Sequence, residues 1–419
     1  MKGKCISVGV LCAAGAIGGH AQAAGFALIE QNASGIGNAF AGAAAVAEDA
    51  STIWFNPAGL TQLPGHDVTV AVHAINPSVK FSNGGSTTPT DISTGGGNGG
   101  NAGDLAVVPN IYAAFALGES WRLGVGLNVP FGMLTEYTSD FIGRFQGLKS
   151  EIKTVNINPT VAYRISPMVS LGAGLNYQKI EADLTDRRVL GVNTEGLSRL
   201  QADDTQIGYN FGALFNLGED TRLGLSYRSG MDYKVKGDAL VTGPTGPTVA
   251  AFPIHADVSA PAMASLSVAQ RYGPEWDLIG DLSWTDWSTI QSINIINSNT
   301  GATAQTLELK LQDSWRLSLG VNYRPSEQWV IRGGLAYDQS SVKDEHRIVR
   351  LPDTDRYWLA LGASYVASKA LSFDVGYVHI FGASAPIDQT PGSAAANGRV
   401  LGEYDLSVDV FSLQARFAF

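Results

Sequence analysis

The stretch VSLGAGLNYQ (Val169–Gln178) alternates residue by residue between apolar side chains and small or polar ones. Successive side chains of an extended chain point to opposite faces, so one face of this segment carries Val169, Leu171, Ala173, Leu175 and Tyr177. The same period of two returns from about residue 66 to the end of the chain, in segments that start at Leu223, Trp315 and Leu371. This pattern is typical of transmembrane β-barrel strands, although a soluble β-sandwich produces it too.

The connections between these segments favour the barrel. Six short turns, such as LGES (117–120) and GED (218–220), alternate with seven long polar connections, and outer-membrane barrels have short turns on one rim and long loops on the other. The long connections lie around residues 83–106, 136–148, 184–203, 238–251, 297–303, 341–352 and 383–401. Together they predict an all-β membrane protein, a 14-stranded antiparallel transmembrane β-barrel over residues 66–419.

The first 23 residues read as a secretory signal peptide, because two lysines precede an apolar run that ends at small residues. Cleavage there would remove Cys5 and Cys12, so no disulfide or thiolate metal site is expected, and neither is any cofactor or metal. A lipoprotein with Cys12 at its start is the rival interpretation, but the apolar run continues past that residue. Charged residues make up only 16% of the chain, fewer than in typical soluble proteins, and no basic stripe suggests nucleic acid as a partner.

The final segment, VFSLQARFAF, places alternate apolar residues on one face and ends in Phe419. A terminal phenylalanine on an alternating strand resembles the signal that is read by the outer-membrane barrel assembly machinery, although an ordinary edge strand would look the same. We therefore expect a bacterial outer-membrane protein, surrounded by outer-membrane lipid and lipopolysaccharide and present as a monomer.

Residues 24–65 do not alternate. They are rich in Ala and Gly, show helical spacings such as Ile36, Phe40 and Val46, and are too few to form a core of their own. A wide barrel has room in its lumen for such a segment. We therefore predict an N-terminal hatch, a mostly helical plug inside the barrel.

One predicted strand contains an irregularity, in LGVGLNVPFGMLTEY (Leu123–Tyr137). Pro130 cannot donate a hydrogen bond to a sheet ladder, and proline is found in sheets only at edges, strand starts and bulges. A closed barrel has no edge strand, so this proline predicts a local break in the wall, or a bulge that merely shapes it.

The order of several motifs resembles the outer-membrane long-chain fatty acid transporter family (FadL-type), which also includes transporters of aromatic hydrocarbons. The motifs are AGF, SGIGNAFAG, AEDAST followed by NPAGL, VPFG, NPTVAYRIS, YRSGM, TDWSTIQ, DSWRLSLG and LPDTDRYWLALGASY. They run through the whole chain after residue 23. The resemblance implies a fourteen-stranded barrel plugged by an N-terminal hatch, and the strand count above agrees with it.

The resemblance also implies site residues. Ala24, Gly25 and Phe26 would form the base of a substrate pocket, and Phe131 and Met133 would line its exit. The lateral gate falls on Asn128, Pro130, Phe131 and Gly132, and the hatch motif on Asn56, Pro57 and Ala58. We expect this hatch motif to end a helix rather than to contact cargo, because Asn bonds its own backbone and Pro fixes a turn. Leu28, Ile36 and Phe40 are further candidates for the pocket wall.

A basic residue that fatty-acid members carry directly after Lys-Ile-Glu is missing, because the chain reads Ala182 there. Possible headgroup contacts are Arg187 and Arg188 in the third long loop, and Lys310 or Arg316 if they project inward from the tenth strand. If none of them meets a carboxylate, the cargo would be an uncharged aromatic hydrocarbon.

The predicted function is uptake of hydrophobic molecules, most of all long-chain fatty acids, by diffusion through the pocket and lateral release. A general porin would need an open, charged channel, which the hatch and the break at Pro130 argue against. An outer-membrane enzyme is the other alternative, but the chain has neither a G-x-S-x-G nor an H-E-x-x-H motif.

Overall fold

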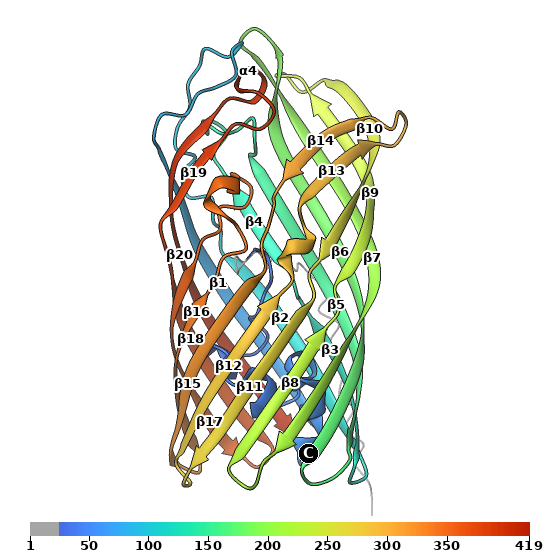
Figure 1. Ribbon diagram of the computed structural model, residues 1–419, viewed down its shortest axis with the longest axis vertical. Helices are drawn as coiled ribbons and strands as arrows, with labels where there is room; N and C mark the ends of the chain where they lie inside the picture. Colours follow the sequence, from blue (N-terminus) through green and yellow to red (C-terminus); the bar gives the residue numbers. More distant parts are fainter. Residues whose placement is uncertain (1–24) are drawn as a thin grey trace, which may run out of the picture.

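A computed structural model describes residues 25–419 as one closed antiparallel β-barrel around an inner plug (Figure 1). Twenty strand segments form a single sheet. Six barrel strands are each interrupted once, at β3/β4, β8/β9, β10/β11, β12/β13, β14/β15 and β18/β19, so the wall has fourteen strands. The barrel closes where β1 pairs with β20, from Asp67↔Ala418 to Asn83↔Gly402.

The strand segments and helices have the following bounds. The strands are β1 (Asp67–Asn83), β2 (Ala106–Leu117), β3 (Trp121–Asn128), β4 (Gly132–Glu136), β5 (Lys149–Arg164), β6 (Val169–Gly191), β7 (Thr194–Asn216), β8 (Thr221–Arg228), β9 (Met231–Thr242), β10 (Thr248–Ala260), β11 (Met263–Tyr272), β12 (Trp276–Thr285), β13 (Ser292–Asn297), β14 (Thr303–Glu308), β15 (Ser314–Ser326), β16 (Trp329–Asp338), β17 (Arg356–Ser368), β18 (Leu371–Gly382), β19 (Ala385–Gln389) and β20 (Val400–Ala418). The helices are α1 (Ala33–Ile36), α2 (Ala43–Val46), α3 (Thr52–Phe55), α4 (Ala394–Asn397) and the 3₁₀ turns η1 (Pro57–Gln62), η2 (Trp287–Thr289) and η3 (Asp344–His346).

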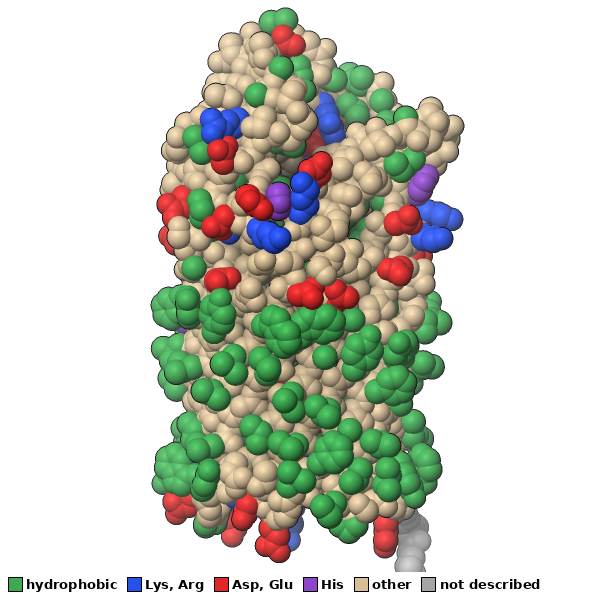
Figure 2. Space-filling model, in the orientation of Figure 1, with side chains coloured by type: hydrophobic (Ala, Val, Ile, Leu, Met, Phe, Trp, Pro, Cys, Tyr) green, Lys and Arg blue, Asp and Glu red, His purple; other side chains and the backbone are tan. Residues whose placement is uncertain are grey.

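The alternation of the sequence becomes an apolar belt on the outside of the wall. On the face seen in Figure 2, hydrophobic side chains cover the lower half of the barrel, with charged side chains above them and at the lower rim. Leu171, Leu175 and Tyr177 are about half exposed on this outer face, at 46%, 58% and 55%. None of the helices within residues 25–419 is long and apolar enough to cross a membrane.

Two of the long connections predicted from sequence are largely strand. β6 and β7 pair from Val169↔Phe215 to Gly191↔Thr194, so the segment 184–203 is a long hairpin with a tight turn rather than a loop. Likewise, β9 and β10 leave only residues 243–247 between them. Strands that extend beyond the apolar belt carry polar residues on both faces, so their composition resembles that of a loop.

The hatch lies inside the barrel, but its helices are short. α1, α2 and α3 each have four residues and are joined by turns, so the prediction of a mostly helical plug was too strong. Small residues make these turns possible: Gly42 has a φ of +70°, and a Cβ there would lie 3.0 Å from Ile279 of the wall. We call residues 25–31 the hatch arm and residues 32–65 the hatch base.

Candidate substrate chamber and lateral exit

The wall is interrupted at Pro130. Along β5, the pair Asn128↔Asn156 is followed by Gly132↔Lys153, so three residues of the kinked strand face two residues of β5. On the other side, β2 pairs with β3 but no pairing joins β2 to β4 in the part of the chain that the structure describes. The ladder between the second and third barrel strands therefore ends at the proline.

The outer face beside this gap is apolar. Leu105, Val107 and Ile111, before and within β2, are 55%, 47% and 43% exposed. The outer part of the gap is filled by Ala102 of the loop between β1 and β2, whose carbonyl accepts a hydrogen bond from the amide of Glu136 at 2.9 Å. The gap thus opens onto an apolar part of the outer surface.

The hatch arm supplies the backbone hydrogen bonds that the broken ladder lacks. The amide of Leu28 donates to the carbonyl of Pro130 at 2.8 Å, and the amide of Gly132 donates to the carbonyl of Phe26 at 2.9 Å. In addition, Nε2 of Gln31 donates to the carbonyl of Val129 at 3.1 Å. Because buried backbone groups without partners are costly, the arm in this position stabilises the kinked strand.

Wall side chains satisfy the remaining groups of the kink. The amide of Phe131 donates to Oγ1 of Thr154 at 2.9 Å, and the same hydroxyl donates back to the carbonyl of Phe131. The amide of Val129 donates to Oδ1 of Asn110 at 3.3 Å. The kink is therefore a fully bonded feature that depends partly on the arm and partly on the wall.

Three aromatic rings from separate parts of the chain meet behind the kink. The rings of Phe26 and Phe131 lie 5.8 Å apart, and Trp287 of η2 packs edge-on against Phe26 at 4.7 Å. Gly25 must be a glycine here, because its φ is +63° and a Cβ would lie 2.7 Å from the Trp287 ring. The first residues of the arm are thus held between the kink and an inward turn of the opposite wall.

These rings belong to an apolar chamber in the lumen. Its buried members come from the arm, the kink and β4, the strands β6, β7, β9, β10 and β13, the turn around η2, and the β14–β15 and β16–β17 connections. They are Phe26, Phe131, Met133, Ile180, Leu200, Met231, Tyr233, Val235, Ala239, Ile254, Ala256, Ala260, Trp287, Ile290, Ile295, Leu309, Leu311, Val342 and Leu351. A lumen lined in this way favours hydrocarbon over water.

A cavity of about 130 Å³ lies next to the chamber, between the hatch and the wall. The hatch side is mostly apolar, with Leu28, Ile29, Ala43, Ala44, Trp54 and Phe55, whereas the wall side carries Ser226, Arg228, Ser265, Asp281, Ser283, Ser314, Arg316 and Asp338. Met263 and Trp287 line the cavity and also pack in the chamber, so the two spaces adjoin.

Asparagine side chains connect this cavity to the kink along the inner wall. Nδ2 of Asn156 donates to Asn128 at 3.0 Å and to Asn176 at 3.1 Å, and Asn176 accepts a further hydrogen bond from Arg228. Nδ2 of Asn176 in turn donates to Asn210 at 3.1 Å. All four amides are nearly or fully buried, so they are structural hydrogen-bond partners rather than surface groups.

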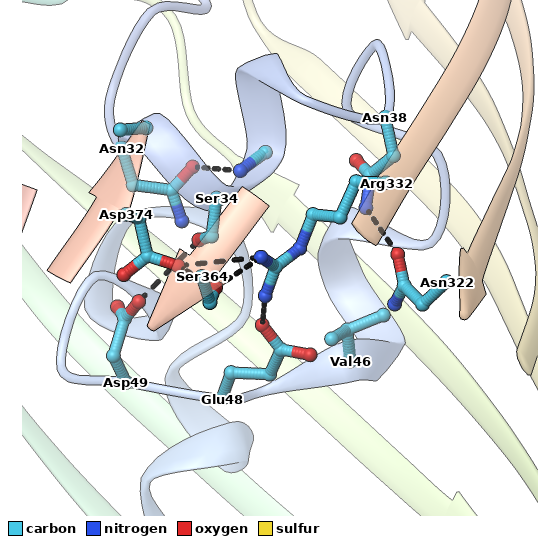
Figure 3. A network of polar contacts seen from close by, with 12 residues as sticks. Asn32, Ser34, Asn38, Val46, Glu48, Asp49, Asn322, Arg332, Ser364 and Asp374 are labelled. Carbon is cyan, nitrogen blue, oxygen red and sulfur yellow. Dashed lines mark hydrogen bonds and ion pairs between the residues drawn. The ribbon is translucent and has the colours of Figure 1, made fainter. Parts of the chain in front are cut away.

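The hatch base is attached to the wall by charged groups. Figure 3 shows Arg332 of β16 between Glu48 of the base and Asp374 of β18. Its guanidinium lies 2.6 Å from the Glu48 carboxylate and 3.3 Å from that of Asp374. On the same side of the hatch, Asp49 accepts a hydrogen bond from Gln414 of β20 at 2.9 Å.

The structure places the sequence-predicted pocket residues as follows. Gly25 and Phe26 lie at the base of the chamber, and Phe131 and Met133 line it, whereas Ala24 and the predicted signal peptide fall outside the described residues. Of the further candidates, Leu28 lines the cavity, while Ile36 and Phe40 pack against the wall strands instead. Ile36 and Phe40 do not line the cavity, because the short helices and turns of the hatch direct them toward the wall.

The hatch motif is buried and shapes the backbone. α3 ends at Phe55, and Oδ1 of Asn56 accepts a hydrogen bond from the amide of Ala58 at 3.1 Å, with Pro57 opening η1. Nδ2 of the Asn56 side chain donates to the carbonyls of Ala44 and Ala213, which ties the hatch to β7.

The four cations proposed as headgroup contacts do not meet in one place. Arg187 and Arg188 lie within β6 rather than in a loop, and Arg188 pairs with Asp186 at 2.9 Å. Lys310 lies in the connection between β14 and β15, is about half exposed and pairs with the exposed Glu308 at 3.8 Å. Only Arg316 lines the cavity, and it is paired with Asp281 at 3.5 Å.

Two residues of the site, Trp287 and Arg228, were not predicted from the sequence. Trp287 interrupts the alternation of its strand in TDWSTIQ, which was a visible signal for a break. Arg228 falls on the inward face of β8 in the YRSGM motif. Its importance depends on neighbours from other strands, which one sequence cannot identify. Within residues 25–419, no group of His, Cys, Asp and Glu is arranged to hold a metal ion.

Comparison with known proteins is consistent with this geometry. A family model described as outer membrane protein transport protein (OMPP1/FadL/TodX) matches residues 14–419. A long-chain fatty acid transport protein of Escherichia coli O6:H1 is 28% identical over 417 residues, which cover 90% of this chain and 91% of that protein. A 47 kDa outer membrane protein of Pasteurella multocida is 30% identical, with 87% of this chain and 89% of that protein covered.

Solved structures share the fold. The crystal structure of a Pseudomonas aeruginosa FadL homologue superposes with a TM-score of 0.88 at 24% identity, covering 94% of this chain and all of that chain. The Ralstonia pickettii toluene transporter TbuX gives a TM-score of 0.67 at 18% identity, covering 92% and 98% of the two chains. The similarity extends over the hatch as well as the barrel.

Proposed function

The chain belongs to the family of outer membrane transport proteins that includes FadL and TodX, and we propose that it takes up long-chain fatty acids and releases them sideways through the gap beside Pro130. The members of this family are transporters or channels rather than enzymes, so the enzyme alternative falls away. The observation that carries the proposal is the broken ladder, which lies between an apolar chamber and an apolar outer face.

The energetics of the cargo favour a lateral route. Each buried CH₂ contributes about 0.8 kcal/mol, so a sixteen-carbon chain gains on the order of 10 kcal/mol when it leaves water. Release into the periplasm would cost nearly all of this free energy, whereas release into the bilayer would cost little. The hatch base also stands in the direct path through the barrel and is held by the ion pair of Glu48 with Arg332 of the wall.

We propose three steps in order. The cargo enters the chamber from the outer loops, the arm moves away from the kink, and the cargo leaves between β2 and β4. The outer-membrane lipid would receive it at the apolar belt. We further propose that the protein works as a monomer embedded in lipid and lipopolysaccharide, and that Phe419 at the end of β20 is read by the barrel assembly machinery during insertion.

Uncharged aromatic hydrocarbons are the second candidate cargo. Ala182 stands where a basic residue is expected, and a cavity of about 130 Å³ is close to the size of an engineered cavity, roughly 150 Å³, that binds benzene. Growth of a transporter-deficient strain on oleate or on toluene would distinguish the two cargoes.

The test of the lateral route is to repair the ladder. Replacing Pro130 by Thr and Gly132 by Val supplies strand formers and a missing amide donor, and we expect a folded barrel that no longer supports oleate uptake. The control variant is Pro261→Thr with Ala262→Val, at the break between β10 and β11 on another part of the wall. Unchanged uptake in the Pro130 variant would refute lateral release at this gap.

A further inference from the structure

Arg228, the last residue of β8, has no carboxylate partner. Eight arginines are buried within residues 25–419, and six of them pair with Asp or Glu; the exceptions are Arg228 and Arg122. Arg122 lies near the opposite end of the hatch and donates to backbone carbonyls, including that of Leu63. A buried cation without a counter-ion is costly, which points to a missing partner at Arg228.

The Arg228 side chain is held in a fixed position. It stacks on the ring of Trp54 at 3.7 Å, donates to the carbonyl of Trp54 at 3.0 Å and donates to Oδ1 of Asn176. A guanidinium has five N–H donors, and the other three have no acceptor among the residues that the structure covers. Free donors on a rigid fork are suited to bidentate binding of a carboxylate.

These donors belong to a residue that lines the cavity beside the chamber. Two carboxylates line the same cavity, but each already has a cation: Asp281 pairs with Arg316, and Asp338 pairs with Arg356 at 2.9 Å. Arg228 therefore leaves an uncompensated positive charge on the cavity wall. The hatch side of the cavity is mostly apolar, so a headgroup could lie against Arg228 while its hydrocarbon chain follows Leu28 toward the chamber.

We propose that Arg228 binds the carboxylate of the transported fatty acid, and that this cavity is the headgroup subsite of the transport path. The proposal rests on the proposed function and deepens it, because it selects ionised acids over uncharged hydrocarbons. Arg228 thus replaces Arg187, Arg188, Lys310 and Arg316 as the candidate that contacts the carboxylate headgroup.

The test compares two ligands with the same chain, oleate and oleyl alcohol, binding to the purified full-length protein in detergent. Hydrogen bonds to charged groups contribute enough for about a ten- to hundredfold change in affinity. We expect Arg228→Gln to weaken oleate binding by at least tenfold and to change oleyl alcohol binding less than twofold. Arg122→Gln is the matched control, since it also removes a buried unpaired arginine, and it should leave both affinities unchanged.

A second variant tests the charge without removing the arginine. Ser226→Asp would place a carboxylate two residues from Arg228 on the same face of β8, and we expect it to reduce oleate binding selectively as well. This variant decides the question if Arg228→Gln does not fold, as judged by the faster migration of unheated barrels in SDS gels. An equal loss for both ligands, or no loss for oleate, would overturn the proposal. If neither ligand binds the unaltered protein, the proposed function itself fails.

Discussion

The arm and the base of the hatch hold their glutamates in opposite ways. Burial raises the pKa of Glu30 in the arm to about 7, although its own backbone amide and the charge of Arg356 oppose the shift. Burial acts in the same direction on Glu48 in the base, but there the charge and the hydrogen bond of Arg332 outweigh it, and the pKa of Glu48 falls below its usual value. Near pH 7, Glu30 is therefore partly protonated, whereas Glu48 stays ionised.

This difference indicates which part of the hatch can move. The base is attached through the ion pair of Glu48 with Arg332 of the wall, and moving the base away would separate the Glu48 carboxylate from the cation that keeps it ionised. The arm is attached by aromatic contacts and backbone hydrogen bonds, which can be exchanged for contacts with an apolar ligand. The structure therefore supports a gate whose moving part is the arm alone.

The largest effect is expected when the arm is fixed to the kink. Ala27 and Phe131 form an antiparallel bridge, and bridge partners have Cα separations that a disulfide can span. The chain has no cysteine after Cys12, so Ala27→Cys with Phe131→Cys would form a single new disulfide. We expect oleate uptake to stop under oxidising conditions and to return when a reductant is added.

A tether in the base serves as the control for that experiment. A Cβ added at Gly320 would lie 3.0 Å from the Cβ of Ala41, so Ala41→Cys with Gly320→Cys can form a disulfide after the two move apart by a few tenths of an ångström. This tether should leave uptake unchanged. Uptake that persists with the arm oxidised, or stops only with the base oxidised, would reverse the assignment of the moving part.

The next largest effect concerns the base itself. Arg332→Gln removes the cation from the partly exposed Glu48 of the base and from the buried Asp374 of the wall, and breaking a buried ion pair in this way costs about 3–5 kcal/mol. We expect the base to loosen, with higher ion conductance in planar bilayers and faster cleavage within residues 32–65 by added protease. Arg399→Gln is the control, because its pair with Asp388 is exposed at the outer rim and exposed ion pairs contribute little to stability. Equal conductance of the two variants would mean that the ion pairs do not hold the base.

Much of the barrel was predictable because the lipid imposes a regular pattern. Side chains such as Leu171 and Tyr177 alternate with lumen residues, and Pro130, which interrupts that alternation in the sequence, stands where the ladder between the second and third barrel strands ends. Arg187 and Arg188 were misplaced because strands outside the membrane have no lipid-facing residues to mark them. The alternation of apolar and polar residues therefore predicts the strands within the membrane but not their extensions beyond it.

The site was less predictable, since it is made of contacts between distant segments. Trp287 reaches Phe26 across 261 positions of the sequence, and Arg228 is distinguished only by the absence of an acidic partner among its neighbours. Lys310 lies in the interruption between β14 and β15, where its backbone is left-handed with a φ of +44°. Such properties depend on the folded arrangement and have no local sequence signal.

The smallest effect is a pH dependence that should exist in the arm and not in the base. The pKa of Glu30 is raised in the docked arm, from 4.5 to about 7, so its contribution to docking is complete below about pH 4.5 and is lost as the pH rises through 7. The shift, in which the opposing charge of Arg356 is already included, corresponds to at most about 3 kcal/mol. We expect the arm to detach more readily at alkaline pH.

Cysteine labelling can measure this change. The maleimide labelling rate of Ala27→Cys, divided by that of Thr300→Cys in an exposed loop, cancels the ordinary pH dependence of thiol reactivity. The ratio should rise between pH 5 and pH 8 by up to about a hundredfold if docking weakens by the full amount, and it should be flat in a Glu30→Gln background. The docked base offers the converse case: because the pKa of Glu48 is lowered by Arg332, Glu48 stays ionised across this range and its attachment should not change. A ratio that rises equally with and without Glu30 would place the titrating group elsewhere and remove the distinction between arm and base.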